Sequence, residues 1–166
     1  MDQGMTRDEL ADLLEELAAD LDTMDHPWRL IGSAALMVAG VDWPSCQDID
    51  ILTTAIGAQA LEARWAIRRD TGYPLDGEAP FRSRFSTYDF THGRVEVMGD
   101  LMVRGPYGWT PLDPGPVAHH HFAGRMWPAP DLDDQVRILK TFGRPKDLEK
   151  AAVLAAHILD RPQQGA

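Results

Sequence analysis

The stretch "SCQDIDILTT", residues 45–54, places two acidic residues one position apart inside an apolar run. Asp48 and Asp50 alternate with Ile49 and Ile51, which predicts a β-strand whose two carboxylates project from one face. Two carboxylates at this spacing repel each other unless a cation lies between them, and hard oxygen ligands of this kind suit Mg²⁺. The alternative is an exposed acidic strand that discourages pairing with other sheets.

A glycine–serine pair precedes this strand. The segment "LIGSAAL", residues 30–36, reads as an apolar strand that ends at Gly32 and Ser33 and leads into a short helix. Backbone N–H groups at such a helix start can meet a phosphate, and glycine leaves room for a close approach. Ser33 could hydrogen-bond a phosphate oxygen or cap the helix. Taken alone, the pair indicates only a helix start.

A third acidic residue follows in "RVEVMGD", residues 94–100. Glu96 lies between Val95 and Val97, and an acid between two valines is unusual for a strand. It could be a solvated position on a half-exposed hairpin. It could also be a third metal ligand from a neighbouring strand. The residues themselves leave both interpretations open.

The chain alternates helices and strands before it ends in helices. The first half is predicted to contain helices over 6–22, 32–40 and 58–72 and strands over 28–31 and 48–54. Thr6 and Glu9 form a capping box at the start of the first helix, and Leu61, Trp65 and Ile67 are apolar positions of the third. The second half is predicted to contain a turn-rich connection over 73–80, strands over 84–90 and 94–103, an ordered loop over 104–116, helices over 131–142 and 145–160, and a frayed tail over 161–166. This order predicts an α+β fold: a small mixed sheet of three to five strands, flanking helices on one face, and a C-terminal helical segment.

The bulk composition sets limits on domain count, partners and compartment. A chain of 166 residues with 44% hydrophobic content suits one domain over 1–166, with a core over about 28–103 and C-terminal helices over about 131–160. A formal net charge of −10 argues against a partner that is a long nucleic acid. The longest apolar run, residues 34–41, is too short to span a bilayer, and the N-terminus shows no secretory signal. With one cysteine, Cys46, we expect no internal disulfide, a structural thiol and a cytoplasmic protein.

Together these motifs resemble the nucleotidyltransferase superfamily, the DNA polymerase β-like fold in its small bacterial forms. The resemblance covers residues 28 to 155, approximately, most of the chain. It rests on four motifs in order: Ile31-Gly32-Ser33, the strand Asp48-Ile49-Asp50-Ile51, the later acid Glu96, and "GRPKDLEKAAVL" from Gly143, which is similar to the family's GRxKD helix start.

The resemblance implies a Mg²⁺-dependent enzyme with two metal ions, for which Mn²⁺ could substitute. It would move a nucleoside monophosphate from an NTP such as ATP to a hydroxyl of a small molecule or protein, and release pyrophosphate. Asp48 and Asp50 would hold the metals, Glu96 would be the third ligand and candidate base, and Gly32 and Ser33 would contact the β- and γ-phosphates. A catalytically silent binding protein of the toxin–antitoxin type is the second hypothesis. A metal-dependent phosphohydrolase is the third.

Two further groups carry open interpretations. Arg144 and Lys146 flank a predicted helix start, where they could clamp a triphosphate or simply pair with acids such as Asp147. The run His119–His121 would place its first and last members on one face if the segment is extended. Two histidines could bind a transition metal, but a loop that lines the acceptor pocket is the preferred interpretation.

Overall fold

The computed structural model describes residues 4–71 and 81–160, so the predicted connection over 73–80, the predicted helix end at Gly72 and the tail over 161–166 lie outside the described part. The helices are α1 (Arg7–Asp22), α2 (Gly32–Val38), α3 (Ala55–Arg64), α4 (Leu132–Phe142) and α5 (Pro145–Asp160), with a 3₁₀ turn η1 (Ala66–Arg68). The strands are β1 (Trp28–Ile31), β2 (Asp48–Thr53), β3 (Phe81–Phe90), β4 (Gly93–Gly105), β5 (Gly108–Pro111), β6 (Val117–Phe122) and β7 (Arg125–Pro130). Among the described helices, none is long and apolar enough to cross a membrane.

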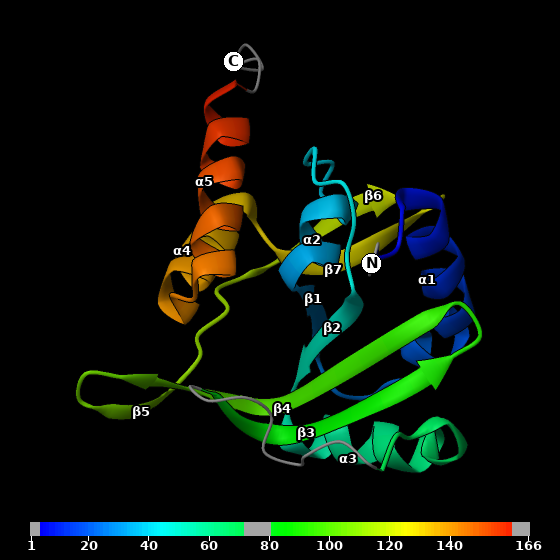
Figure 1. The fold of residues 1–166 in the computed structure, drawn as a ribbon. Coiled ribbons are helices and arrows are strands. Elements are labelled where there is room, and N and C mark those ends of the chain that lie inside the picture. Colours follow the sequence, from blue (N-terminus) through cyan, green and yellow to red (C-terminus); the bar gives the residue numbers. More distant parts are fainter. Residues whose placement is uncertain (1–3, 72–80, 161–166) are drawn as a thin grey trace.

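The main sheet has five strands and mixed pairing, which confirms the predicted α+β class (Figure 1). Its order is β1-β2-β4-β3, with β5 paired to the far end of β4. Strand β2 runs parallel to β4, and the other neighbours are antiparallel. This parallel pairing sets the register between the first and the later acidic motif, because equivalent positions of β2 and β4 lie side by side.

Helices cover both faces of this sheet, whereas the sequence predicted one. The leucines of α1 are fully buried against the face that carries Ile49 and Val95, and α3 joins the same core through Leu61. The capping box of Thr6 and Glu9 is present at the start of α1. Burial of each such leucine contributes about 1.5–3 kcal/mol, so this face supplies most of the packing energy. The opposite face carries the acidic residues and meets the α4–α5 pair.

The helix after β2 begins and ends earlier than the sequence predicts. Thr54 caps its first turn by accepting a hydrogen bond from the backbone of Gly57 at 3.0 Å. The α-helix ends at Arg64, because Trp65 leaves helical geometry while its indole donates to Asp20 at 2.8 Å. Ile67, predicted as an apolar helix position, is 98% exposed, so that prediction is wrong.

A second, two-stranded sheet replaces the loop predicted around His119–His121. Strands β6 and β7 pair antiparallel, and His119 and His121 are both exposed on one face. The ring of His120 points the other way and contacts the carbonyl of Pro130 at 3.2 Å. The face-sharing expected of an extended segment is therefore present, but the acceptor-pocket loop is not. Similarly, part of the predicted loop over 104–116 is the hairpin of β4 with β5.

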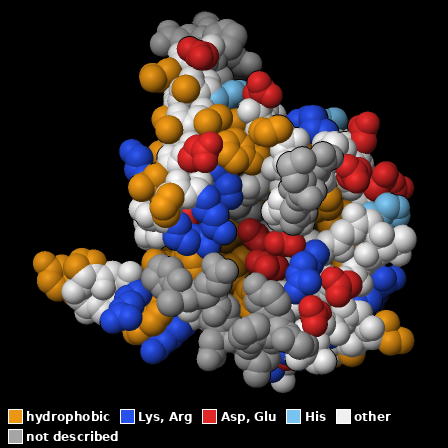
Figure 2. Space-filling model, viewed as in Figure 1, with side chains coloured by type: hydrophobic (Ala, Val, Ile, Leu, Met, Phe, Trp, Pro, Cys, Tyr) orange, Lys and Arg blue, Asp and Glu red, His pale blue; other side chains and the backbone are white. Residues whose placement is uncertain are grey.

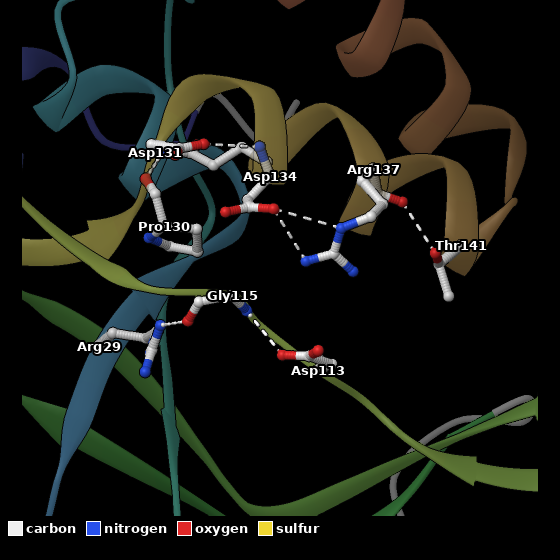
Figure 3. Close-up of polar contacts among 9 residues, drawn as sticks. Arg29, Asp113, Gly115, Pro130, Asp131, Asp134, Arg137 and Thr141 are labelled. Carbon is white, nitrogen blue, oxygen red and sulfur yellow. Dashed lines mark hydrogen bonds and ion pairs between the residues drawn. The ribbon is translucent and has the colours of Figure 1, made fainter.

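The C-terminal helices have the predicted boundaries. Asp131 caps α4 by accepting from the backbone of Asp134 at 2.8 Å, as Figure 3 shows. Gly143 ends α4 with φ +72°, a conformation that glycine adopts without strain, and Pro145 opens α5. The two helices pack on α2 through Leu36, Leu139 and Leu154. This contact holds the α4–α5 turn beside the acidic face of the sheet.

Candidate active site

The three predicted acids lie together on neighbouring strands. Asp48 and Asp50 alternate with buried isoleucines along β2, and Asp50 is directly opposite Glu96 in the parallel ladder with β4. Partners in such a ladder point to the same face of the sheet. Glu96 is therefore beside Asp50, and is not a solvated position on a remote hairpin. The geometry contradicts the solvated hairpin position, and a metal-binding role for Glu96 stays a prediction.

Asp50 is the most perturbed group in this cluster. The residue as a whole is half-buried, and its Oδ1 atom is buried with no hydrogen-bond partner among the described residues. Burial raises the pKa of Asp50 well above its ordinary value, and the negative charges of Glu96 and Asp48 raise it further. A hydrogen bond joins Asp50 to Glu96. In the metal-free protein, Asp50 therefore retains its proton to a higher pH than an ordinary aspartate does.

Gly32 allows the first turn of α2 to lie against this cluster. Its φ is +73°, and a Cβ atom at this position would lie 2.7 Å from Oδ2 of Asp50. Any other residue would be strained in the backbone and would press on a buried carboxyl. Ser33, predicted beside it as a phosphate contact, is half-buried and does not line the pocket described next.

A pocket of about 240 Å³ opens over the three acids. One wall is acidic, with Asp48, Asp50 and Glu96, and Gly32 lies at its edge. The facing wall comes from the α4–α5 turn. Aromatic and aliphatic side chains fill the remaining wall: Ile31, Phe81, Phe85, Met98, Leu101, Leu139 and Phe142. Figure 2 shows acidic side chains at the centre of this side of the molecule, with Lys and Arg side chains directly beside them.

The structure confirms that Arg144 pairs with Asp147, and its role as a phosphate contact stays a prediction. Its Nε atom donates to Oδ2 of Asp147 at 2.6 Å, so the predicted ion pair exists. Arg144 and Lys146 nevertheless line the pocket across from the acids. The guanidinium lies over the ring of Phe81, 4.8 Å from its centroid. A cationic wall facing an acidic wall can bind an anionic ligand that carries its own cation.

Two charged residues of α5 were not predicted from the sequence to belong to the site. Asp147, considered only as a surface partner, is 1% exposed and lines the pocket. Lys150 lies one helical turn after Lys146, close enough for the charges of Asp50 and Asp147 to act on it. Burial lowers the pKa of Lys150, and these two acids partly offset that shift. The spacing of four residues from Lys146 was the available signal, since it places both lysines on one helix face.

The donor set suits a divalent cation, although the side chains are not in ligating positions. The negative charges of Glu96 and Asp48 raise the pKa of Asp50, and a cation among the three carboxylates would offset this repulsion. Carboxylate oxygens are the ligands that Mg²⁺ prefers. Within residues 4–71 and 81–160, no group of three or more His, Cys, Asp or Glu side chains is arranged to hold a metal ion. Metal binding would therefore require these side chains to rearrange, and below the raised pKa of Asp50 it would also release the proton of that residue.

Comparison with solved structures identifies the fold. No protein-family model matches the sequence, and a search of the curated proteins finds no match. TM1012 of Thermotoga maritima, a proposed nucleotidyltransferase, aligns with a TM-score of 0.74 at 25% identity, over 95% of this chain and 98% of that one. The lincosamide adenylyltransferase LnuA, solved with lincomycin, aligns with a TM-score of 0.59 at 15% identity, over 92% of this chain and 98% of that one.

The antibiotic-resistance factor ANT(2'')-Ia is also similar, with a TM-score of 0.60 at 12% identity, over 92% of this chain and 85% of that one. A second structure of ANT(2'')-Ia contains adenylyl-2''-tobramycin, and aligns with a TM-score of 0.58 at 13% identity, over 90% of this chain and 88% of that one. The chain thus has the nucleotidyltransferase fold, and the likeness to TM1012 supports an enzyme of that class.

Proposed function

We propose that this protein is a Mg²⁺-dependent nucleotidyltransferase that moves a nucleoside monophosphate from an NTP to a hydroxyl group of a small molecule. The observation that carries the proposal is the register of β2 and β4, which places Glu96 beside Asp50 in a pocket whose far wall holds Arg144 and Lys146. A silent binding protein would have no need to keep three mutually repelling acids together in a pocket.

The reaction assigns a role to each group. The acceptor oxygen attacks the α-phosphorus, the bond from that phosphorus to the bridging oxygen breaks, and pyrophosphate leaves. Glu96 accepts the proton of the acceptor hydroxyl, and Arg144 and Lys146 bind the non-bridging phosphate oxygens. Gly32 leaves room for the phosphate chain beside the acids. Magnesium, held by Asp48, Asp50 and Glu96, would neutralise the charge on the entering and leaving oxygens.

A small acceptor fits the site better than a macromolecule. The pocket is about 240 Å³, and the net charge of −10 disfavours a long nucleic acid. LnuA was solved with lincomycin and ANT(2'')-Ia with an adenylylated tobramycin, which are small molecules with hydroxyl groups. The adenylylated tobramycin, and the description of LnuA as an adenylyltransferase, also make ATP the first donor to test. No feature of the pocket favours the protein acceptor or the phosphohydrolase considered from the sequence.

The proposal is tested by transfer of label from α-phosphate. Each of the four NTPs, labelled at the α-phosphate, is incubated with Mg²⁺, the protein and the small-molecule fraction of a cell extract. We expect a labelled product that is absent with Asp48→Asn and Asp50→Asn. Asp133→Asn, which removes an exposed carboxyl of α4, is the matched control and should retain transfer. Release of label as free monophosphate would identify a hydrolase, and transfer that survives both site variants would contradict the proposed site.

A further inference from the structure

We infer that Asp147 is a positioning residue, which holds the guanidinium of Arg144 in the orientation that binds the triphosphate of the donor nucleotide. This inference rests on the proposed function, because it concerns the same pocket. The sequence marks Asp147 only as the acid of the GRxKD pattern and as a possible partner of Arg144, whereas its role follows from its burial and its contacts.

Asp147 takes three hydrogen bonds from a single residue. Its Oδ2 accepts from Nε of Arg144 at 2.6 Å and from the backbone N–H of Arg144 at 3.3 Å. Its Oδ1 accepts from a terminal guanidinium nitrogen of Arg144 at 3.1 Å. Two parallel bonds to one carboxylate fix the plane of a guanidinium as well as its position. The ring of Phe81, which extends from β3, supports this plane from one side.

The burial of Asp147 distinguishes this pair from a surface ion pair. The carboxylate is 1% exposed, and an exposed pair would contribute about 0–1 kcal/mol, whereas a buried carboxylate that loses its partner is strongly destabilised. The chain offers a direct comparison in Asp134 and Arg137 of α4, which have the same spacing of three residues. Figure 3 shows this pair, in which the side chain of Arg137 is 44% exposed. Neither residue lines the pocket.

Fixing Arg144 matters because a free arginine side chain loses much rotational freedom when it binds a ligand. The hydrogen bonds to Asp147 impose that restriction before the nucleotide arrives. Asp147 also caps the helix. It is the third residue of α5, and its carboxylate accepts a hydrogen bond from the backbone N–H of Arg144 at the helix start. A test must therefore separate orientation of the side chain from capping of the helix.

The direction in which one substitution changes the affinity for a phosphate ligand distinguishes a positioning role from a simple electrostatic effect. Removing a negative charge beside a phosphate site should strengthen anion binding by Coulomb's law. Removing a positioning group should weaken it. Asp147→Asn provides the test, because its carbonyl oxygen can still accept the backbone N–H of Arg144 and preserve the helix start, while the paired charge-assisted bonds are lost.

The experiment measures Kd by calorimetry for Mg²⁺-ATP and for Mg²⁺-tripolyphosphate, which lacks base and sugar. We expect Asp147→Asn to weaken binding of both probes by about tenfold, the effect of losing one charge-assisted hydrogen bond. In an Arg144→Ala background the same substitution should change Kd by less than about twofold. Arg144→Lys keeps the charge but loses the planar fork, and should also weaken binding about tenfold. Asp134→Asn, the matched control, should leave Kd unchanged.

Tighter or unchanged binding by Asp147→Asn would overturn the inference. An equal loss in both backgrounds, together with a lower Tm, would also overturn it and reduce Asp147 to a helix cap. The wild type serves as the reference for the proposed function: failure of the wild type to bind either probe would overturn that function, and the inference with it. Binding by the wild type with no effect of Asp147→Asn rejects only the inference.

Discussion

The proton on Asp50 links the stability of the metal-free protein to pH. Because burial and the charges of Glu96 and Asp48 raise the pKa of Asp50, the folded protein retains this proton over a range in which the unfolded chain has lost it. The stabilisation is fully present below the ordinary pKa of an aspartate, near pH 4, and is lost as pH rises through the raised pKa of the folded state. Asp50→Asn has no such proton to lose.

The expected magnitude follows from this difference of one proton. Within the window, the free energy of unfolding of the wild type should fall by up to about 1.4 kcal/mol per pH unit relative to Asp50→Asn. The asparagine amide can still donate to Glu96, so the two proteins should have similar stability near pH 4. The variant should become the more stable protein at higher pH.

Urea unfolding in EDTA, from pH 4 upward, measures both curves. Asp133→Asn controls for the loss of one surface charge, since Asp133 is exposed on α4. Added Mg²⁺ should reverse the order, because it stabilises the wild type and has little effect on Asp50→Asn. Parallel pH profiles for wild type and Asp50→Asn would refute the reasoning, and so would a variant that is the less stable protein throughout.

Three further predictions concern Gly32, Leu17 and Cys46. Gly32→Ala should abolish nucleotidyl transfer and lower the stability by about 1–2 kcal/mol, because φ is +73° and the added Cβ would press on Asp50. The label assay measures the first effect and urea unfolding the second. Wild-type values in both assays would contradict this account. Leu17→Ala should cost about 2–5 kcal/mol of stability, because Leu17 is a fully buried residue of α1 in the main core. A denaturant midpoint close to that of the wild type would be inconsistent with the described core. Cys46 is 2% exposed, and burial raises the pKa of its thiol to about 12. A thiol reagent at pH 8 should therefore label Cys46 only when the protein unfolds. Rapid labelling of the native protein would contradict this prediction, because it would show that the thiol is accessible.

The local patterns of the sequence predicted the acidic face well. Alternation of Asp48 and Asp50 with isoleucines is enough to orient the strand, and the capping signals at Thr6 and Gly143 mark two helix ends correctly. These features depend on residues close in sequence, and their physical cause is local. The register that brings Glu96 to Asp50 depends on the pairing of two distant strands, so the sequence alone left it open.

The missed elements have identifiable causes. Strand β6 alternates exposed histidines with less exposed positions, and histidine carries little strand propensity or apolar signal. Strand β5 is short and rich in glycine and proline, which resembles a loop. The start of α3 was predicted too late in the sequence, because Thr54, which caps the helix, reads as the last residue of the preceding strand. The role of Asp147 was missed because burial decides it, and burial follows from tertiary packing.

Glu96→Gln gives the most direct test of the central claim, that the three acids perform nucleotidyl transfer. The glutamine keeps the size of the side chain and can still hydrogen-bond Asp50, so the fold and the pocket should remain. The measurement is transfer of α-phosphate label in a single turnover, with Mg²⁺-NTP binding determined on the same preparation. We predict that the variant binds nucleotide while transfer falls by at least about 100-fold, because it has lost the proton acceptor. Transfer at the wild-type rate would contradict the account and remove Glu96 from the reaction.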